Sequence, residues 1–133
     1  MKLESILIVL LLIHLDISVM NCYSPLLEVD SVSVVAEQES ADVGRSFSMS
    51  CTIAGIDVSV SLSIAHQWYK DEHPIQGATF PTLHFSALKL SDIGSYVCEV
   101  AIRSNSQKHG IITSSDPYIL NISSKLQTTA IKL

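Results

Sequence analysis

The sequence predicts an all-β fold, an antiparallel β-sandwich, and two observations support this prediction. From residue 26 onward, apolar residues recur with a period of two, in short runs separated by breakers such as Pro74, Gly77 and Pro81. Beyond the first residues, no segment has the 3.6-residue apolar repeat of an amphipathic helix. Short alternating strands divided by turns are typical of two sheets packed face to face.

Six segments of the chain carry this alternating pattern. In the second of them, Phe47, Met49, Cys51 and Ile53 alternate with serine and threonine, as in a half-buried strand. In order, the six segments cover residues 32–36, 45–53, 64–70, 82–88, 94–102 and 117–123. The stretch 55–63 reads as either a long loop or an extension of a strand, and 103–110 reads as a turn.

The first 22 residues are expected to be a signal peptide. Lys2 precedes an uninterrupted apolar run over residues 6–13, and Asp16 ends the hydrophobic character soon after. A transmembrane helix needs about 20 apolar residues, whereas this run has the length of a signal-peptide core. We expect cleavage between residues 20 and 24. The alternative, a buried N-terminal helix or strand, lacks a polar pattern that would set one face.

The remaining chain is expected to form one domain over residues 26–124, followed by a polar tail over residues 125–133. A length of about 110 residues suits a single hydrophobic core. After the first block no apolar stretch is long enough to cross a membrane. We therefore expect a secreted mature chain without a membrane span. A fragment of a longer, membrane-anchored cell-surface protein would have the same pattern.

The charge balance is mildly acidic, with 8 Lys and Arg against 13 Asp and Glu. The basic residues are scattered along the sequence and do not form a cluster. A nucleic-acid partner would require such a cluster to meet the phosphate backbone. The composition therefore argues against nucleic-acid binding.

The chain has three cysteines, Cys22, Cys51 and Cys98. A secretory start implies an oxidising compartment, in which cysteine pairs tend to form disulfides. Cys51 and Cys98 both lie on the inward phase of their strands, so their sulfurs can meet if the two strands belong to opposite sheets. Trp68 would then cover the bond. Cys22 lies at the cleavage zone, and if it is retained it is an unpaired thiol and a route to covalent dimers.

Six residues, in this order along the chain, resemble the signature of the immunoglobulin fold: Cys51, Trp68, Asp92, Gly94, Tyr96 and Cys98. The resemblance covers residues 29–124. It implies one inter-sheet disulfide between Cys51 and Cys98. It also implies a tyrosine corner, in which the Tyr96 hydroxyl bonds to backbone between residues 88 and 92. In this arrangement Gly94 allows a tight entry into the strand, and Asp92 shapes the preceding turn.

Two features depart from the family pattern. The stretch between Cys51 and Trp68 is longer than usual, which predicts an extended loop. His66 stands two residues before Trp68, where the family usually has an aliphatic residue, so either the register differs or His66 hydrogen-bonds to backbone. Between Trp68 and Leu83 there is little room for the two additional strands of variable domains. The resemblance is therefore to the intermediate or constant-like type of adhesion molecules and receptors.

Motifs for catalysis or metal binding are missing from the sequence. The five histidines form no H-x-H or H-E-x-x-H pattern, and there is no C-x-x-C. A G-x-S-x-G elbow and a Gly-rich phosphate loop are also absent. We therefore expect no enzyme activity, no metal and no cofactor. Asn121 begins the one N-glycosylation sequon, Asn121-Ile122-Ser123.

The resemblance implies a non-catalytic extracellular module that recognises a protein ligand, or a copy of itself, in cell adhesion or receptor signalling. The alternative is a structural spacer repeat, or a truncated fragment of a larger multi-domain cell-surface or matrix protein. The immunoglobulin fold hosts many partners, so the fold alone does not name the ligand.

A candidate binding face follows from the strand phases. Because Trp68 and Cys98 point inward, their chain neighbours point outward, and a usable sequon at Asn121 sets Ile119 outward as well. The candidate residues are Gln67, Tyr69, Val97, Glu99 and Ile119. Aromatic and aliphatic anchors within a polar rim are typical of protein-binding surfaces, although scattered exposed apolar residues are also normal. A glycan on Asn121 would stand on the same sheet and could cover this patch.

Overall fold

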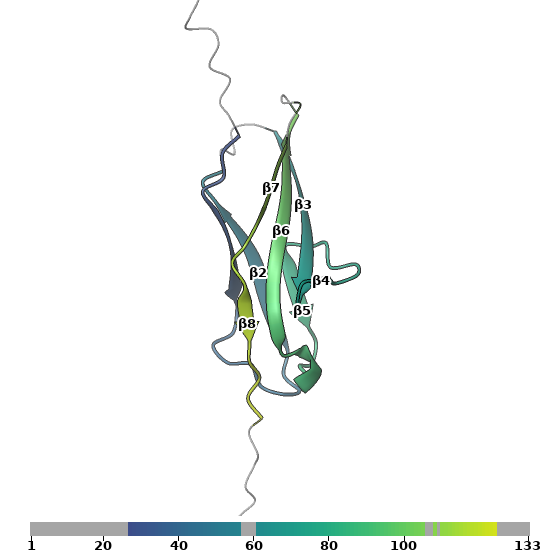
Figure 1. The fold of residues 1–133 in the computed structure, drawn as a ribbon. Coiled ribbons are helices and arrows are strands. Elements are labelled where there is room, and N and C mark those ends of the chain that lie inside the picture. Colours follow the sequence, from purple (N-terminus) through teal and green to yellow (C-terminus); the bar gives the residue numbers. More distant parts are fainter. Residues whose placement is uncertain (1–26, 57–60, 106–107, 109, 125–133) are drawn as a thin grey trace, which may run out of the picture.

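The chain forms two antiparallel sheets that pack against each other (Figure 1). The computed structural model describes residues 27–56, 61–105, 108 and 110–124. The smaller sheet has the order β1-β2-β5, with β1 at Ser31–Ala36, β2 at Phe47–Ala54 and β5 at Thr82–Phe85. The larger has the order β4-β3-β6-β7, and β8 also pairs with β6. Its strands are β3 Leu62–Lys70, β4 His73–Pro74, β6 Gly94–Ser104, β7 Gly110–Ser114 and β8 Tyr118–Leu120.

The core lies between the sheets and is filled by alternate side chains of the long strands. β6 supplies four consecutive inward residues, Tyr96, Cys98, Val100 and Ile102, all with almost no exposed surface. The other buried apolar residues are Val32, Phe47, Met49, Cys51, Trp68, Leu88 and Leu120. Each large apolar side chain removed from water contributes roughly 1.5–3 kcal/mol. Because the buried residues alternate along each long strand, the period of two in the sequence reflects which side chains enter the core.

The six predicted strand segments are confirmed, but two further strands were not predicted. β4 lies in the breaker-rich segment after Trp68 and follows a two-residue turn. Asp71 and Glu72 in that turn both have positive φ, as a type I′ hairpin requires. Asp is common at the first of these positions, but the second usually holds Gly, so Asp71-Glu72 lacks the Asn-Gly or Asp-Gly pair that signals such a turn. β7 was missed, and the predicted turn at 103–110 was too wide, because β6 continues to Ser104 and β7 already begins at Gly110.

A bulge separates β7 from β8 along their common partner β6. Glu99 pairs with Ser114 whereas Tyr96 pairs with Tyr118, so one extra residue is inserted between these two pairs. At the bulge, the backbone N–H of Ser115 donates to the carbonyl of Cys98 at 2.9 Å, and the Ser115 hydroxyl accepts from the Cys98 N–H at 3.1 Å. The buried Ser115 side chain therefore replaces a missing backbone acceptor beside the core.

The sequence left two questions open before Trp68: whether residues 55–63 form a loop or extend a strand, and whether the register changes near His66. β3 begins at Leu62, so the end of the stretch 55–63 is a strand extension, while residues 57–60 lie outside the described residues. The register does not change near His66, which pairs with Val100 just as Trp68 pairs with Cys98. Burial lowers the pKa of His66, because it disfavours the charged imidazolium.

The predicted signal peptide over residues 1–22, Cys22 and the tail over residues 125–133 lie outside the described residues, and they stay predictions. Within the residues that are described, no helix has the length and apolar character needed to cross a membrane.

Candidate functional site

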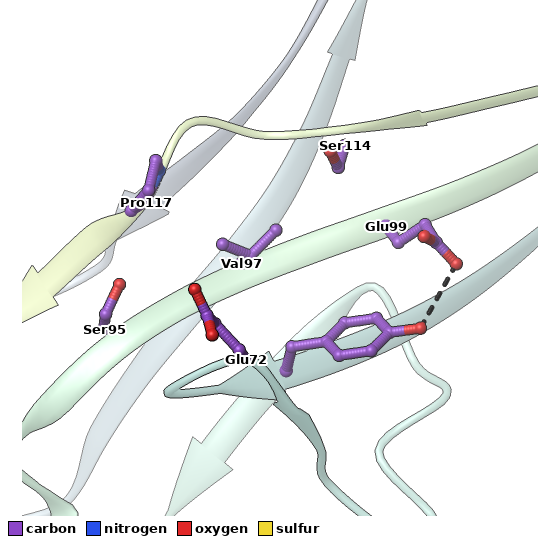
Figure 2. A pocket seen from close by; sticks show the side chains of 7 residues that line it. Glu72, Ser95, Val97, Glu99, Ser114 and Pro117 are labelled. Atoms are coloured by element: carbon purple, nitrogen blue, oxygen red, sulfur yellow. Dashed lines mark hydrogen bonds between the residues drawn. The ribbon is translucent and has the colours of Figure 1, made fainter.

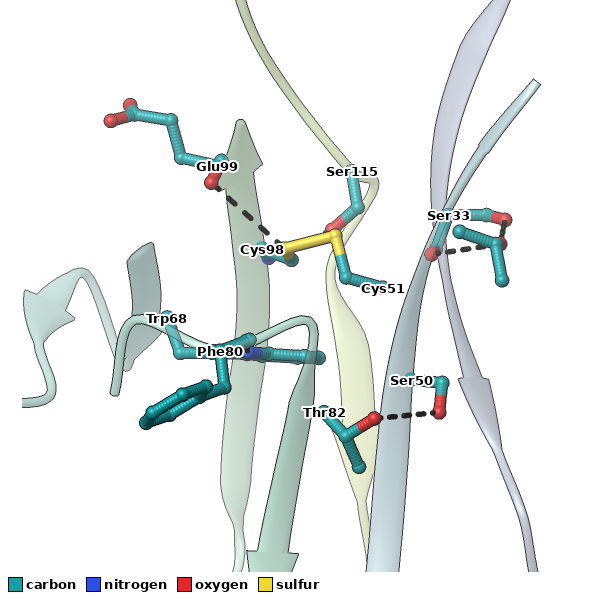
Figure 3. The surroundings of a disulfide bond; sticks show 10 residues. Ser33, Ser50, Cys51, Trp68, Phe80, Thr82, Cys98, Glu99 and Ser115 are labelled. Atoms are coloured by element: carbon teal, nitrogen blue, oxygen red, sulfur yellow. Dashed lines mark hydrogen bonds between the residues drawn. A yellow bond between two sulfur atoms is a disulfide. The ribbon is translucent and has the colours of Figure 1, made fainter. Parts of the chain in front are cut away.

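The predicted disulfide joins the two sheets. Cys51 on β2 and Cys98 on β6 are bonded, with 6.1 Å between their Cα atoms. Trp68 lies beside this bond in Figure 3 and is fully buried. Its indole N–H donates to the carbonyl of Phe80 at 2.9 Å, so the one polar group of the ring is satisfied. Both the pairing and the placement of Trp68 are confirmed.

The tyrosine corner is confirmed as well. The Tyr96 hydroxyl donates to the carbonyl oxygen of Asp92 at 2.6 Å, within the range of residues that the resemblance implied. The Asp92 carboxylate accepts from the N–H of Lys89 at 2.8 Å and so shapes its own turn around the 3-10 helix η2, Leu90–Asp92. These two bonds fix the point at which the chain enters β6.

Gly94 leaves room for two side chains at the β3–β4 turn. A Cβ at this position would lie 2.8 Å from Cε of Lys70 and 2.9 Å from Oδ2 of Asp71. Asp71 uses this proximity, because its Oδ1 accepts from the N–H of Ser95 at 2.9 Å. The Lys70 ammonium donates to the carbonyl of Ser91. The glycine therefore lets β6 start directly against the end of β3.

Two antiparallel sheets, an inter-sheet disulfide covered by a tryptophan, and a tyrosine corner are now in place together. The domain has an immunoglobulin-like fold. Its larger sheet carries the two-residue strand β4 at the edge of β3. Within the described part of the chain, no three His, Cys, Asp or Glu side chains gather closely enough to hold a metal ion.

Because of the tyrosine corner, we expect the stability of the folded domain to fall at alkaline pH. Burial, followed by the negative charges of Asp92 and Asp71, raises the pKa of Tyr96 to about 12. An unfolded tyrosine titrates near about 10, so the folded state holds the proton more tightly. This contribution to stability is complete below about pH 10 and is lost as the pH rises to about 12. We expect Tyr96→Phe to cost about 1–2 kcal/mol at neutral pH and to flatten this alkaline loss.

Urea denaturation followed by circular dichroism between neutral pH and pH 12 measures both effects. Tyr69→Phe is the matched control, because Tyr69 is half-buried on the outward face and far from Asp92 in the chain. The tyrosine corner would not be the source of the alkaline loss if the Tyr96→Phe protein showed the same decline as the parent chain.

The five candidate binding residues share the outward face of the larger sheet. Gln67 pairs with Glu99, and Tyr69 pairs with Val97, so these four side chains stand on one side of β3 and β6. Ile119 pairs with Ser95 and is 58% exposed, while Leu120 next to it is buried. The expected phase of every candidate residue is therefore observed. Whether this face binds a partner stays a proposal.

The Gln67 side chain is held in place by two hydrogen bonds to backbone. Its side-chain amide donates to the carbonyls of Trp68 and Ile75, both at 2.9 Å. This bonding ties β3 to the segment that follows β4. The Tyr69 hydroxyl lies 3.4 Å from Oε1 of Glu99, a long hydrogen bond that leaves the carboxylate able to accept others.

A hollow of about 340 Å³ opens on this face between Tyr69 and Val97 on one side and the bulge on the other. Figure 2 shows Glu72, Val97 and Glu99 among the side chains that line it. The lining residues are Tyr69, Glu72, Ser95, Val97, Glu99, Ser114 and Pro117. Apolar and carboxylate groups thus meet in one concave site, which is typical of a binding surface with a few convergent polar groups.

Several members of this face were not found from the sequence. Glu72 belongs to the type I′ turn and Pro117 to the bulge, and both features depend on tertiary structure. Ile112 on β7 is 73% exposed, and it shares the outward face because it pairs with Ala101. Its alternation with the neighbouring residues was the one signal that could have revealed it. Asn121 is exposed, as the sequon requires.

Comparison with known proteins finds similar solved structures but no matching family model or curated protein. Among solved structures, the chain is similar to the N-terminal four Ig domains of Dscam1 isoform 4.44, with 19% identity over 72% of this chain and a TM-score of 0.43. For the N-terminal four Ig domains of Dscam1 isoform 6.9, the identity is 20% over 71% of this chain and the TM-score is 0.42. For a third solved structure, described as the structural basis for Dscam isoform specificity, the identity is 18% over 72% of this chain and the TM-score is 0.43. The chain covers 21% of each of those solved chains.

Proposed function

We propose that this domain is a non-catalytic extracellular module that recognises a protein through the outward face of its larger sheet. The observation that supports the proposal is the hollow beside Tyr69, on a face that also carries the exposed Ile112 and Ile119. Two exposed isoleucines and a half-buried tyrosine on one face supply the apolar anchors of a protein interface, and Glu72 and Glu99 supply a polar rim. The disulfide fits an oxidising, extracellular setting.

Removing the tyrosine anchor tests this proposal. We expect Tyr69→Ala to weaken partner binding by about tenfold or more, because central aromatic anchors carry much of the energy of an interface. The measurement is saturable binding of the labelled secreted protein to the surface of cells that express this gene, with circular dichroism as a fold check. Phe80→Ala is the matched control, since Phe80 is an exposed aromatic residue outside this face. Unchanged binding by Tyr69→Ala would exclude this face as the site.

A glycan on Asn121 could affect binding at this face, and the variant Asn121→Gln tests this. Asn121 stands two residues beyond Ile119, so a glycan there would project close to the hollow. In the same binding measurement, stronger binding by Asn121→Gln would mean that the glycan shields the face. Unchanged binding would mean that the face is accessible beside the glycan or that Asn121 carries none.

A structural spacer is the second candidate function, and one observation favours it. The described chain enters at Leu27 and leaves at Ser124, at opposite ends of the sandwich (Figure 1). A domain with this geometry suits an end-to-end array of modules. The cell-binding experiment separates the two functions, because a spacer shows no saturable partner for the isolated domain and no effect of Tyr69→Ala.

A further inference from the structure

The outward face of the larger sheet is divided into rows by the strand register. In each row, one residue of β3 lies opposite one of β6, which lies opposite one of β7. The three rows that cross all these strands are Ser63–Arg103–Gly110, Ala65–Ala101–Ile112 and Gln67–Glu99–Ser114. The face therefore has an apolar middle row, with a basic residue on one side and an acidic residue on the other.

The basic end is presented by Arg103. This side chain is exposed, and its stem lies across β7, since a Cβ on Gly110 would come within 2.8 Å of Cγ of Arg103. The glycine thus provides the space that the arginine stem occupies. Arg103 is the one basic residue among the three rows.

The acidic end is the hollow. Its described lining contains the carboxylates of Glu72 and Glu99 and no basic side chain. Its lining also includes Val97 and Pro117, which suit the aliphatic stem of a lysine or arginine. A concave site lined by apolar groups and two carboxylates is complementary to a guanidinium group on an aliphatic stem.

We propose that a second copy of this chain occupies the face, in a symmetric dimer whose twofold axis lies between the two facing sheets and runs parallel to the Ala65–Ala101–Ile112 row. Arg103 and Glu99 each lie two residues from Ala101, about 7 Å to either side along the strand. Rotation about the axis brings Arg103 of each copy to the acidic hollow of the other. A twofold interface requires such self-complementarity, in which the same two groups meet twice.

The middle row suits a contact of this kind. Ala65 and Ala101 are small, so two sheets can approach closely there, and Ile112 is 73% exposed and becomes covered. The apolar row supplies the burial, while the charge pairs set the orientation and exclude a parallel arrangement, which would oppose Arg103 to Arg103. The inference deepens the proposed function, because it names the partner of the same face.

Charge reversal and its rescue test the proposal. We compare Glu99→Arg, Arg103→Glu and the double reversal by sedimentation equilibrium of the secreted full chain, up to its solubility limit. All proteins carry Cys22→Ser and Asn121→Gln, so that covalent dimers and a glycan do not enter the result. Each single reversal opposes like charges twice, and we expect it to weaken the dimer by about tenfold or more. The double reversal restores opposite charges and should return association to near that of the parent chain.

Glu39→Arg, Arg45→Glu and their combination are the matched controls. These exposed residues lie around a separate polar hollow near the start of β2, and the substitutions change the net charge by the same amounts. They should leave the dimer unchanged.

A parent chain that is monomeric at every concentration, or single reversals that leave the dimer unchanged, would overturn the second copy as partner. A double reversal no tighter than the singles would also overturn it. The proposed function fails separately, when Tyr69→Ala leaves cell binding unchanged. A monomer whose cell binding is lost in Tyr69→Ala keeps the face as a binding site and assigns it to a different protein.

Discussion

Replacing Cys51 and Cys98 together by Ala should lower the free energy of unfolding by about 2–5 kcal/mol and prevent folding at 37 °C. The bond joins residues separated by 47 positions and links the two sheets through the centre of the core. For a loop of this length, the chain-entropy model gives about 4 kcal/mol. A small domain has a total stability of about 5–15 kcal/mol, so the loss is a large part of the whole. Urea denaturation at 25 °C and the secreted yield at 37 °C measure it.

Two comparisons make this experiment specific. Cys22→Ser changes a cysteine outside the pair, and it should leave the denaturation midpoint unchanged. Mass analysis before and after reduction shows whether the secreted parent chain holds one intact disulfide. A double-Ala protein as stable as its parent, or free thiols at both positions in the secreted parent chain, would contradict the role given to this bond.

The sequence predicted the parts of the fold that depend on alternation along one strand. The four inward residues of β6 follow a strict period of two, and the structure buries all four. The same alternation fixed the outward phase of Tyr69 and Val97, because a residue beside an inward Trp68 or Cys98 must face the other way. These conclusions needed no knowledge of which strands are neighbours.

The hollow could not be predicted, because its lining comes from segments that are distant in the sequence. Glu72 reaches it from a type I′ turn formed by Asp71 and Glu72, which lacks the Gly that usually fills the second position of such a turn. Pro117 reaches it from a bulge that becomes visible only once β7 and β8 are paired with β6. Register between strands is a tertiary property, and a single strand pattern does not contain it.

One serine shows the limit of the alternation rule. Alternating serines on β2 indicated an exposed face, yet Ser48 is buried, which corrects that interpretation. Its backbone N–H donates to Oε1 of Gln38 at 2.8 Å, and its hydroxyl lies 2.8 Å from Nδ1 of His84 on the neighbouring strand. Longer polar side chains on both sides cover the small hydroxyl, so Ser48 is on the outward phase but not in solvent.

Trp68→Ala should be the most destabilising single substitution that leaves the disulfide intact, with a loss of about 3–5 kcal/mol. The ring is fully buried, opposite Cys98 in the register, and beside the disulfide in Figure 3. Truncation removes its transfer energy, leaves a cavity between the sheets, and takes the hydrogen-bond donor from the Phe80 carbonyl.

The Trp68→Phe protein separates these contributions, because it keeps an aromatic ring in the core and loses only the indole N–H and part of the volume. We expect it to cost less than half as much as Trp68→Ala. Phe80→Ala, at a side chain that is 72% exposed, is the control and should change stability by less than about 0.5 kcal/mol. Trp68 is the one tryptophan of the chain, so unfolding is followed by circular dichroism. Equal losses for Trp68→Phe and Trp68→Ala would mean that the hydrogen bond to Phe80, and not the packing of the ring, holds the two sheets at this point.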